Sequence, residues 1–191
     1  MTEKSLKQIL QEQRKYASFF EWPDKQIKEC GVVQSLLESM ENQGIFRFAA
    51  LKPGPHPNNA PDCVAEDVRG GTVAIEVTEF VSRKAIEMNQ KGKNVYHHWK
   101  PDEVVNEVKN IIAKKDNVEY VGGPYSKVIL VIHSDEIALD YEEYSTVLSE
   151  PTFETNIIDE VIFLFSYRPQ VKTYPYVELK VTSNKPLEPI R

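Results

Sequence analysis

Apolar residues recur at helical spacing near the start of the chain and predict two helices there. The first is expected over 5–22, where Ser5 and Gln8 fit a capping box at its beginning. Pro23 then interrupts the pattern, because proline lacks the backbone N–H that a helix interior needs. A second amphipathic stripe predicts a helix over 24–42.

Further helical patterns follow in the second half of the chain. The stretch 81–100 is polar and basic, and it is expected to be part helix and part loop. Pro101 opens a clearer helix, since proline suits the first helical position. A short helix or loop is expected over 141–150. The expected buried face of the helix that starts at Pro101 consists of Val104, Val105, Val108, Ile111 and Ile112.

Short apolar runs between these helices predict strands. They lie at 45–51, 72–81, 126–135, 160–167 and 174–181. The run TVAIEVTEFV at 72–81 is rich in β-branched residues, which favour strands. The run at 126–135 is almost continuously apolar, which is typical of a strand buried on both faces.

The order of these elements predicts an α/β fold with a mixed central sheet flanked by helices. A strand, a helix and a second strand follow one another between Thr72 and Asp135, and such a crossover favours parallel pairing. An N-terminal helix and a C-terminal strand pair are added to this core. With 191 residues, 41% of them hydrophobic, the chain is expected to form a single domain over 1–191.

Composition restricts where the protein works and what it binds. No apolar run is long enough for a membrane span, and the N-terminus lacks the apolar core of a secretory signal. Only two cysteines are present, so a reduced, cytoplasmic protein is expected. The net charge of −6 argues against a broad basic surface coated with nucleic acid, although it allows a small basic groove. The sequence also allows a homodimer.

The candidate chemistry lies in a hairpin over 59–80, where carboxylates accompany apolar strand residues. A three-residue loop over 69–71 places Asp62 opposite Thr78, so that Asp62, Glu76 and Thr78 converge on one face. A two-residue loop slips every face assignment by one position. Asp62 then shares its face with Glu79 instead.

Two carboxylates on one face repel each other, and a hard divalent cation relieves that repulsion. Mg²⁺ prefers carboxylate oxygens and keeps several of its waters, and Mn²⁺ is the alternative ion here. The expected ligands are Asp62, Glu76 and the carbonyl of Val77. Such an ion polarises a phosphodiester and generates hydroxide from bound water.

The hairpin resembles the PD-(D/E)XK nuclease superfamily, which has the restriction-endonuclease-like fold. The resemblance consists of Pro61-Asp62, the glycine turn, Glu76 within AIEVTEF, and the order helix, three strands, helix, strand. It covers about 26–135 and makes 136–191 an elaboration. It implies that Asp62 and Glu76 bind the metal. In some members of the family a glutamate of the preceding helix joins them, and the candidates here are Glu29, Glu38 and Glu41.

The sequence departs from that family at one position. The motif has lysine two residues after the acidic position, where it orients the attacking water and stabilises negative charge, and this chain has Thr78. A threonine hydroxyl positions water but supplies no positive charge. Lys84 and Arg83 are the nearest candidates for a relocated cation, ahead of Lys91 and Lys93.

Other polar residues are expected to be structural. Glu79 is expected to be solvated or salt-bridged, and His133 to lie in the core. His97 and His98, beside Trp99, are expected in a loop. The cysteines, which lack metal-ligand spacing, are expected to pack as small apolar groups.

Three functions therefore compete. The first is metal-dependent hydrolysis of nucleic acid. The second is a catalytically inactive protein of the same fold that binds protein or nucleic acid. The third is an acidic inhibitor that mimics nucleic acid.

Overall fold

A seven-stranded mixed sheet organises the part of the chain that the computed structural model describes, namely residues 25–55, 58–91, 96–136 and 138–184. The α/β prediction is confirmed. The predicted helix over 5–22 lies outside the described residues. The elements are α2 (Lys25–Glu41), β1 (Phe48–Pro53), β2 (Cys63–Asp67), β3 (Thr72–Glu79), α3 (Arg83–Gln90), α4 (Pro101–Lys115), β4 (Lys127–His133), α5 (Tyr141–Ser149), β5 (Thr152–Thr155), β6 (Glu160–Leu164) and β7 (Tyr176–Ser183).

The strand order is β1-β2-β3-β4-β6-β7-β5. The pair β3–β4 is parallel, as the crossover through α4 predicts, and β4–β6 is also parallel. The pairs β1–β2, β2–β3 and β6–β7 are antiparallel. The predicted C-terminal strand pair therefore continues the central sheet beside β4.

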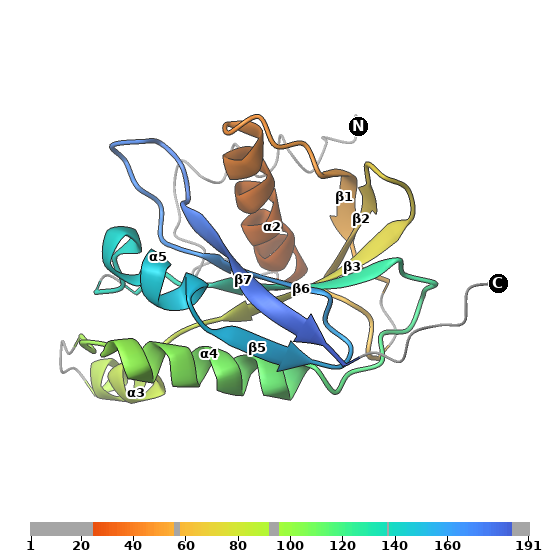
Figure 1. The fold of residues 1–191 in the computed structure, drawn as a ribbon. Helices are drawn as coiled ribbons and strands as arrows, with labels where there is room; N and C mark the ends of the chain where they lie inside the picture. The colour runs from red at the N-terminus through yellow and green to blue at the C-terminus, as the bar shows by residue number, and fades with distance from the viewer. Residues whose placement is uncertain (1–24, 56–57, 92–95, 137, 185–191) are drawn as a thin grey trace.

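Helices cover both faces of the sheet, with α2 on one side and α4 on the other (Figure 1). Each helix buries its own hydrophobic cluster. Residues of α2 pack against Ile75, Val77 and Val131, whereas residues of α4 and α5 pack against Ala74, Leu130 and Phe163. Since neighbouring residues of β3 alternate between the two clusters, Glu76 projects towards the α4 face.

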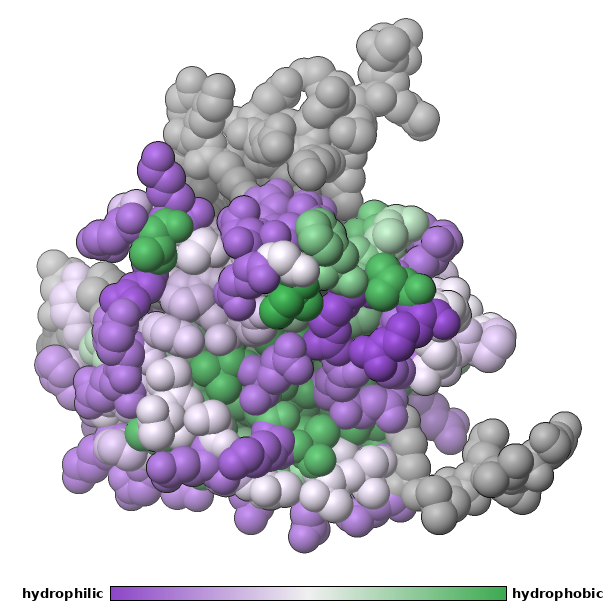
Figure 2. Space-filling view, turned by 45° about the horizontal axis from the view of Figure 1, so that its top comes forward, coloured by the Kyte–Doolittle hydropathy of each residue, from purple (hydrophilic) through white to green (hydrophobic). Residues whose placement is uncertain are grey.

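Hydrophobic residues reach the surface only in separate patches on the side shown in Figure 2, with hydrophilic residues between them. No described helix is both long enough and apolar enough to cross a membrane.

The register of the β2–β3 hairpin differs from both sequence-based alternatives. Cys63 pairs with Ile75 and Glu66 with Thr72, so each β2 residue pairs two positions earlier in β3 than predicted and the centre of the turn lies one residue closer to the N-terminus. The predicted pairing of Asp62 with Thr78 is therefore wrong, and one further step along the observed register places Asp62 beside Glu76. A shift by two keeps every side chain on its predicted face.

The Asp67 side chain explains the earlier turn. Its carboxylate accepts the Arg69 N–H at 2.8 Å, while its own N–H donates to the Gly71 carbonyl at 3.0 Å. Gly70 and Gly71 both adopt positive φ, which glycine tolerates. Val68 is thereby placed in the turn and is exposed.

The first strand begins later than predicted. Residues 42–47 connect the end of α2 to β1. The Ile45 N–H donates to the Met40 carbonyl, and Gly44 between them has a positive φ, as is common at the end of a helix. The strand ends on Pro53, which an edge strand allows.

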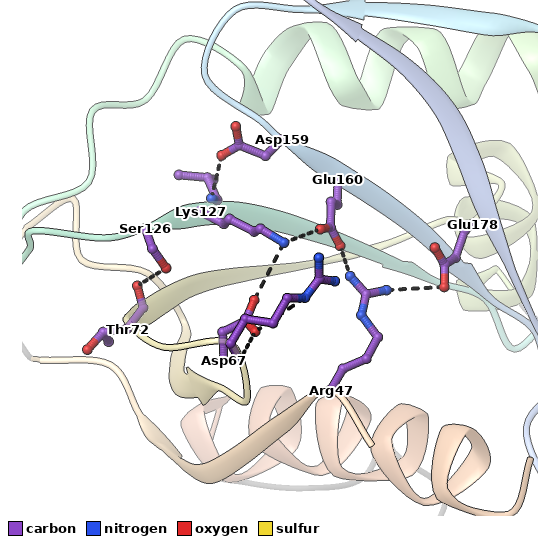
Figure 3. Close-up of polar contacts among 10 residues, drawn as sticks. Arg47, Asp67, Thr72, Ser126, Lys127, Asp159, Glu160 and Glu178 are labelled. Atoms are coloured by element: carbon purple, nitrogen blue, oxygen red, sulfur yellow. Dashed lines mark hydrogen bonds and ion pairs between the residues drawn. The ribbon is translucent and has the colours of Figure 1, made fainter. Parts of the chain in front are cut away.

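A network of opposite charges connects distant strands at the end of the sheet where the β2–β3 turn lies (Figure 3). Arg47 contacts Glu160 of β6 and lies 3.1 Å from Glu178 of β7. Lys127 of β4 lies 2.9 Å from Glu160 and 3.5 Å from Asp67. Glu160 therefore joins the two cations that hold β1, β4 and β6 together.

We expect Glu160→Ala to lower the free energy of unfolding by about 2–3 kcal/mol, because it leaves Arg47 and Lys127 part-buried without their shared partner. Urea denaturation measures the change. Glu178→Ala is the matched control. Its half-exposed carboxylate forms an ion pair with Arg47 alone among the described residues, so its loss should cost less than about 1 kcal/mol. Equal losses in both variants would contradict a central role for Glu160.

Candidate functional site

Three carboxylates and one lysine from four elements meet near the start of β2. We call them the carboxylate–lysine cluster: Glu29 of α2, Asp62 just before β2, Glu76 of β3 and Lys115 at the end of α4. The structure thus brings Asp62 and Glu76 together, as predicted.

Asp62 takes its position from the backbone of β3. Its Oδ2 accepts the Val77 N–H at 2.8 Å, in the place where a longer β2 would have supplied a carbonyl. The N–H and C=O of a strand residue project to the same side, so the Val77 carbonyl also points towards the end of β2. One carboxylate and one carbonyl oxygen therefore lie beside the Glu76 side chain.

Glu76 contacts a cation that the sequence analysis missed. Lys115 Nζ lies 2.5 Å from Glu76 Oε1, with the glutamate side chain only 12% exposed. Lys84 and Arg83, the predicted cations, lie exposed in the first turn of α3. Thr78 lies two residues further along β3 and pairs in register with Ile132.

The sequence contains a pattern that points to Lys115. Val104, Val108 and Ile112 form the buried stripe of α4, and Lys115 is the next position on the same face. A lysine that continues an apolar stripe at the end of a helix is also favourable for the helix dipole. Its side chain must then reach over the sheet, where Glu76 lies.

Glu29 likewise continues a buried stripe of its helix, here near the N-terminal end of α2. It continues the stripe of Val33, Leu36 and Met40 towards the N-terminus of the helix. Of the three glutamates considered, Glu29 is the one whose carboxyl group contacts Asp62. Glu41 is exposed at the other end of the helix.

Burial and the repulsion from Asp62 raise the pKa values of the two glutamates in this cluster. The pKa of Glu29 rises to about 7, first because burial disfavours its charge and then because Asp62 is close. Lys25 opposes this rise from 3.2 Å away. Burial also raises the pKa of Glu76, against the opposing effect of Lys115.

Tyr120 adds a hydrogen-bond donor beside these carboxylates. Its hydroxyl is buried and makes no hydrogen bond within the described part of the chain. Burial raises its pKa first, and the charges of Glu76 and Asp62 raise it further. The phenol is therefore protonated at neutral pH and faces the cluster with an unused O–H group.

The donor set suits a hard cation in type, although the side chains are not yet arranged around one. Among the described residues, no three or more His, Cys, Asp and Glu side chains form a group spaced to hold a metal. Lys115 contacts Oε1 of Glu76 and the Val77 N–H contacts Oδ2 of Asp62, so each of these two carboxylates already has a partner at one oxygen. Mg²⁺ needs only one or two carboxylates, because it retains several waters.

The remaining polar candidates lie apart from the cluster or are structural. His97 Nε2 lies 3.5 Å from Glu103, and His98 is exposed in the segment before α4. His133 is buried at the end of β4, as predicted. Glu79 lies 3.9 Å from Lys28, in agreement with the salt-bridged role expected for it.

We expect Glu29→Gln to change the pH dependence of stability. In the native state Glu29 keeps its proton up to about pH 7, whereas in the unfolded chain it loses it near pH 4.3. Native stability therefore falls as pH rises between these values, since the folded state binds more protons there. The variant lacks this loss.

Urea unfolding at pH 4.5 and pH 8 tests this expectation. The free energy of unfolding of Glu29→Gln, relative to that of the wild type, should increase by about 1–2 kcal/mol from pH 4.5 to pH 8. This is less than the full pKa shift implies, because water screens the site. Glu41→Gln removes an exposed charge from the same helix and should show no such growth. A constant difference at both pH values would contradict the contact between Glu29 and Asp62.

No family model, no curated protein and no solved structure matches this chain. Any functional assignment therefore rests on the geometry of the carboxylate–lysine cluster itself.

Proposed function

We propose that the carboxylate–lysine cluster hydrolyses phosphodiester bonds in nucleic acid with the help of a divalent cation, as a divergent site of the PD-(D/E)XK type. The observation that carries the proposal is the 2.5 Å contact between Lys115 Nζ and Glu76 Oε1. It supplies, from α4, the positive charge that the motif position Thr78 lacks.

The arrangement of elements supports the same proposal. The order α2, β1, β2, β3, α3, α4, β4, with β3 and β4 parallel, supports an αβββαβ core of the restriction-endonuclease-like type in which α3 is an additional helix. The acidic residues also occupy the corresponding places, one on the first helix, one at the start of the second strand and one within the third. We propose that this region is such a core and that β6, β7 and β5 extend its sheet.

The residues of the cluster would have different roles in this reaction. Asp62, Glu76 and the Val77 carbonyl would hold Mg²⁺ or Mn²⁺, with Glu29 as a further carboxylate. The bound cation would lower the pKa of a coordinated water and polarise the phosphate. Lys115 would direct its ammonium group to the phosphate oxygens, where it offsets the negative charge that develops during attack.

Two lysines place positive charge beside the carboxylates, although the chain as a whole is acidic. Lys25 lies 3.2 Å from Glu29 and is 82% exposed, and Lys115 is 31% exposed. Both ammonium groups can therefore reach a phosphate that approaches the cluster. With a divalent cation bound to the carboxylates, these two lysines support nucleic acid as the substrate class without a broad basic face.

We expect Mn²⁺ or Mg²⁺ to raise the Tm of the wild-type protein and to leave the Tm of Asp62→Asn unchanged, because a ligand that binds only the native state stabilises it. At a metal concentration of 100 times Kd, the stabilisation is about 2.7 kcal/mol. Differential scanning calorimetry with and without EDTA measures the shift. Glu66→Gln, an exposed change in the same hairpin, should respond as the wild type does. A wild type that does not respond to either ion would contradict the cation site.

We expect Lys115→Met to reduce metal-dependent cleavage of plasmid DNA or RNA by at least about 10²-fold, the typical loss when one charge-stabilising group is removed. Lys114→Met is the matched control, since Lys114 is exposed on the same turn of α4 and should keep its activity. Lys84→Met tests the cation that the sequence motif favoured and should also stay active. A loss in Lys84→Met with an active Lys115→Met would overturn the role given to Lys115.

Gel assays with Mn²⁺, and with EDTA as the blank, report this cleavage. A wild type that binds the ion and cleaves neither DNA nor RNA would support the alternative, a catalytically inactive binding protein of the same fold.

A further inference from the structure

The two cysteines of the chain meet beneath the carboxylate–lysine cluster. Cys30 of α2 and Cys63 of β2 have their Sγ atoms 2.7 Å apart, although 33 positions separate them in the sequence. Both are free thiols, and both side chains are 0% exposed. A disulfide bond has an S–S distance of about 2.04 Å, so closure requires the sulfurs to move by less than about 1 Å.

Their positions connect the pair to the site. Cys30 directly follows Glu29, and Cys63 directly follows Asp62. Cys63 also pairs with Pro53 of β1 and Ile75 of β3, which fixes it within the sheet. A bond between the sulfurs would therefore attach the helix that carries Glu29 to the strand that begins beside Asp62.

We propose that Cys30 and Cys63 are a disulfide modification site that closes in the presence of a peroxide and clamps α2 onto β2. One thiol attacks a peroxide oxygen, which gives a sulfenic acid and, from hydrogen peroxide, one water. The second thiol then displaces the sulfenic oxygen as a second water and forms the S–S bond. The peroxide is reduced, and the two sulfurs are oxidised by two electrons in total.

Both thiols are fully buried, so an oxidant in solution does not reach them in the closed structure. Reaction therefore requires an excursion in which α2 lifts from the sheet and admits the oxidant. Such a site closes slowly and, once closed, prevents the opening that produced it.

The crosslink would restrict how far Glu29 can move from Asp62. In the oxidised protein Glu29 stays against Asp62, whereas in the reduced protein α2 can move away with it. This effect depends on the contact of α2 with β2 and holds whether or not the cluster cleaves nucleic acid.

Intact-mass spectrometry of the full chain tests the proposal. After incubation with hydrogen peroxide, unfolding and N-ethylmaleimide, the wild-type monomer should have lost two hydrogen atoms and should carry no maleimide. Peptide mapping should find Cys30 joined to Cys63. The Tm should rise by roughly 5–10 °C and return on treatment with dithiothreitol, because the crosslink restricts the unfolded chain.

Cys30→Ser and Cys63→Ser are the controls and should form no intrachain bond. The wild-type mass measurement stands without them if either variant folds poorly. Two maleimides on peroxide-treated wild type would overturn the proposal, as would sulfinic acids or bonds between two chains in place of the internal bond. An internal bond that leaves the Tm unchanged would overturn the clamp on α2.

Discussion

The hydrogen bond from the Val77 N–H to Asp62 is the constraint on which the site depends. It satisfies a backbone group of β3 at the point where β2 ends, and it fixes a carboxylate beside the strand. Glu76 then lies next to Asp62, while α2 brings Glu29 from one side and α4 brings Lys115 from the other. Without that bond, nothing in the backbone would hold the Asp62 carboxylate beside Glu76.

The cluster gathers more negative charge than its surroundings offset. Three carboxylates share a partly buried space, and Lys25 and Lys115 are the cations that contact them. The raised pKa values of Glu29 and Glu76 express that imbalance. Titratable groups perturbed in this way by burial and by one another are typical of functional sites, and a divalent cation would restore the balance. The thiols of Cys30 and Cys63 lie directly below, so the same contact between α2 and β2 supports both the proposed site and its proposed crosslink.

The periodicity of the chain predicted most elements, since amphipathic stripes and apolar runs are local properties of the sequence. The hairpin register was wrong because the Asp67 side chain forms its own turn, a local hydrogen bond that the glycines alone do not reveal. The four-residue strand β5 was not predicted, because it is too short for an alternating pattern and is held by its parallel pairing with β7. Asp62 and Glu76 were predictable from their spacing in one hairpin. Lys115 was not, because its contact with Glu76 depends on how α4 crosses the sheet. Its position in line with the buried stripe of α4 does, however, indicate that its side chain faces the sheet.

The most direct test of the account is the position of a bound metal ion. An anomalous difference map from crystals of the wild-type protein soaked in Mn²⁺ should contain a peak at about 2.1 Å from oxygens of Asp62 and Glu76, close to the Val77 carbonyl. In that state Lys115 Nζ should have left Glu76 and point to the ion's open side. A fully soaked crystal with no peak between the two carboxylates, and with the Lys115–Glu76 contact intact, would contradict the account.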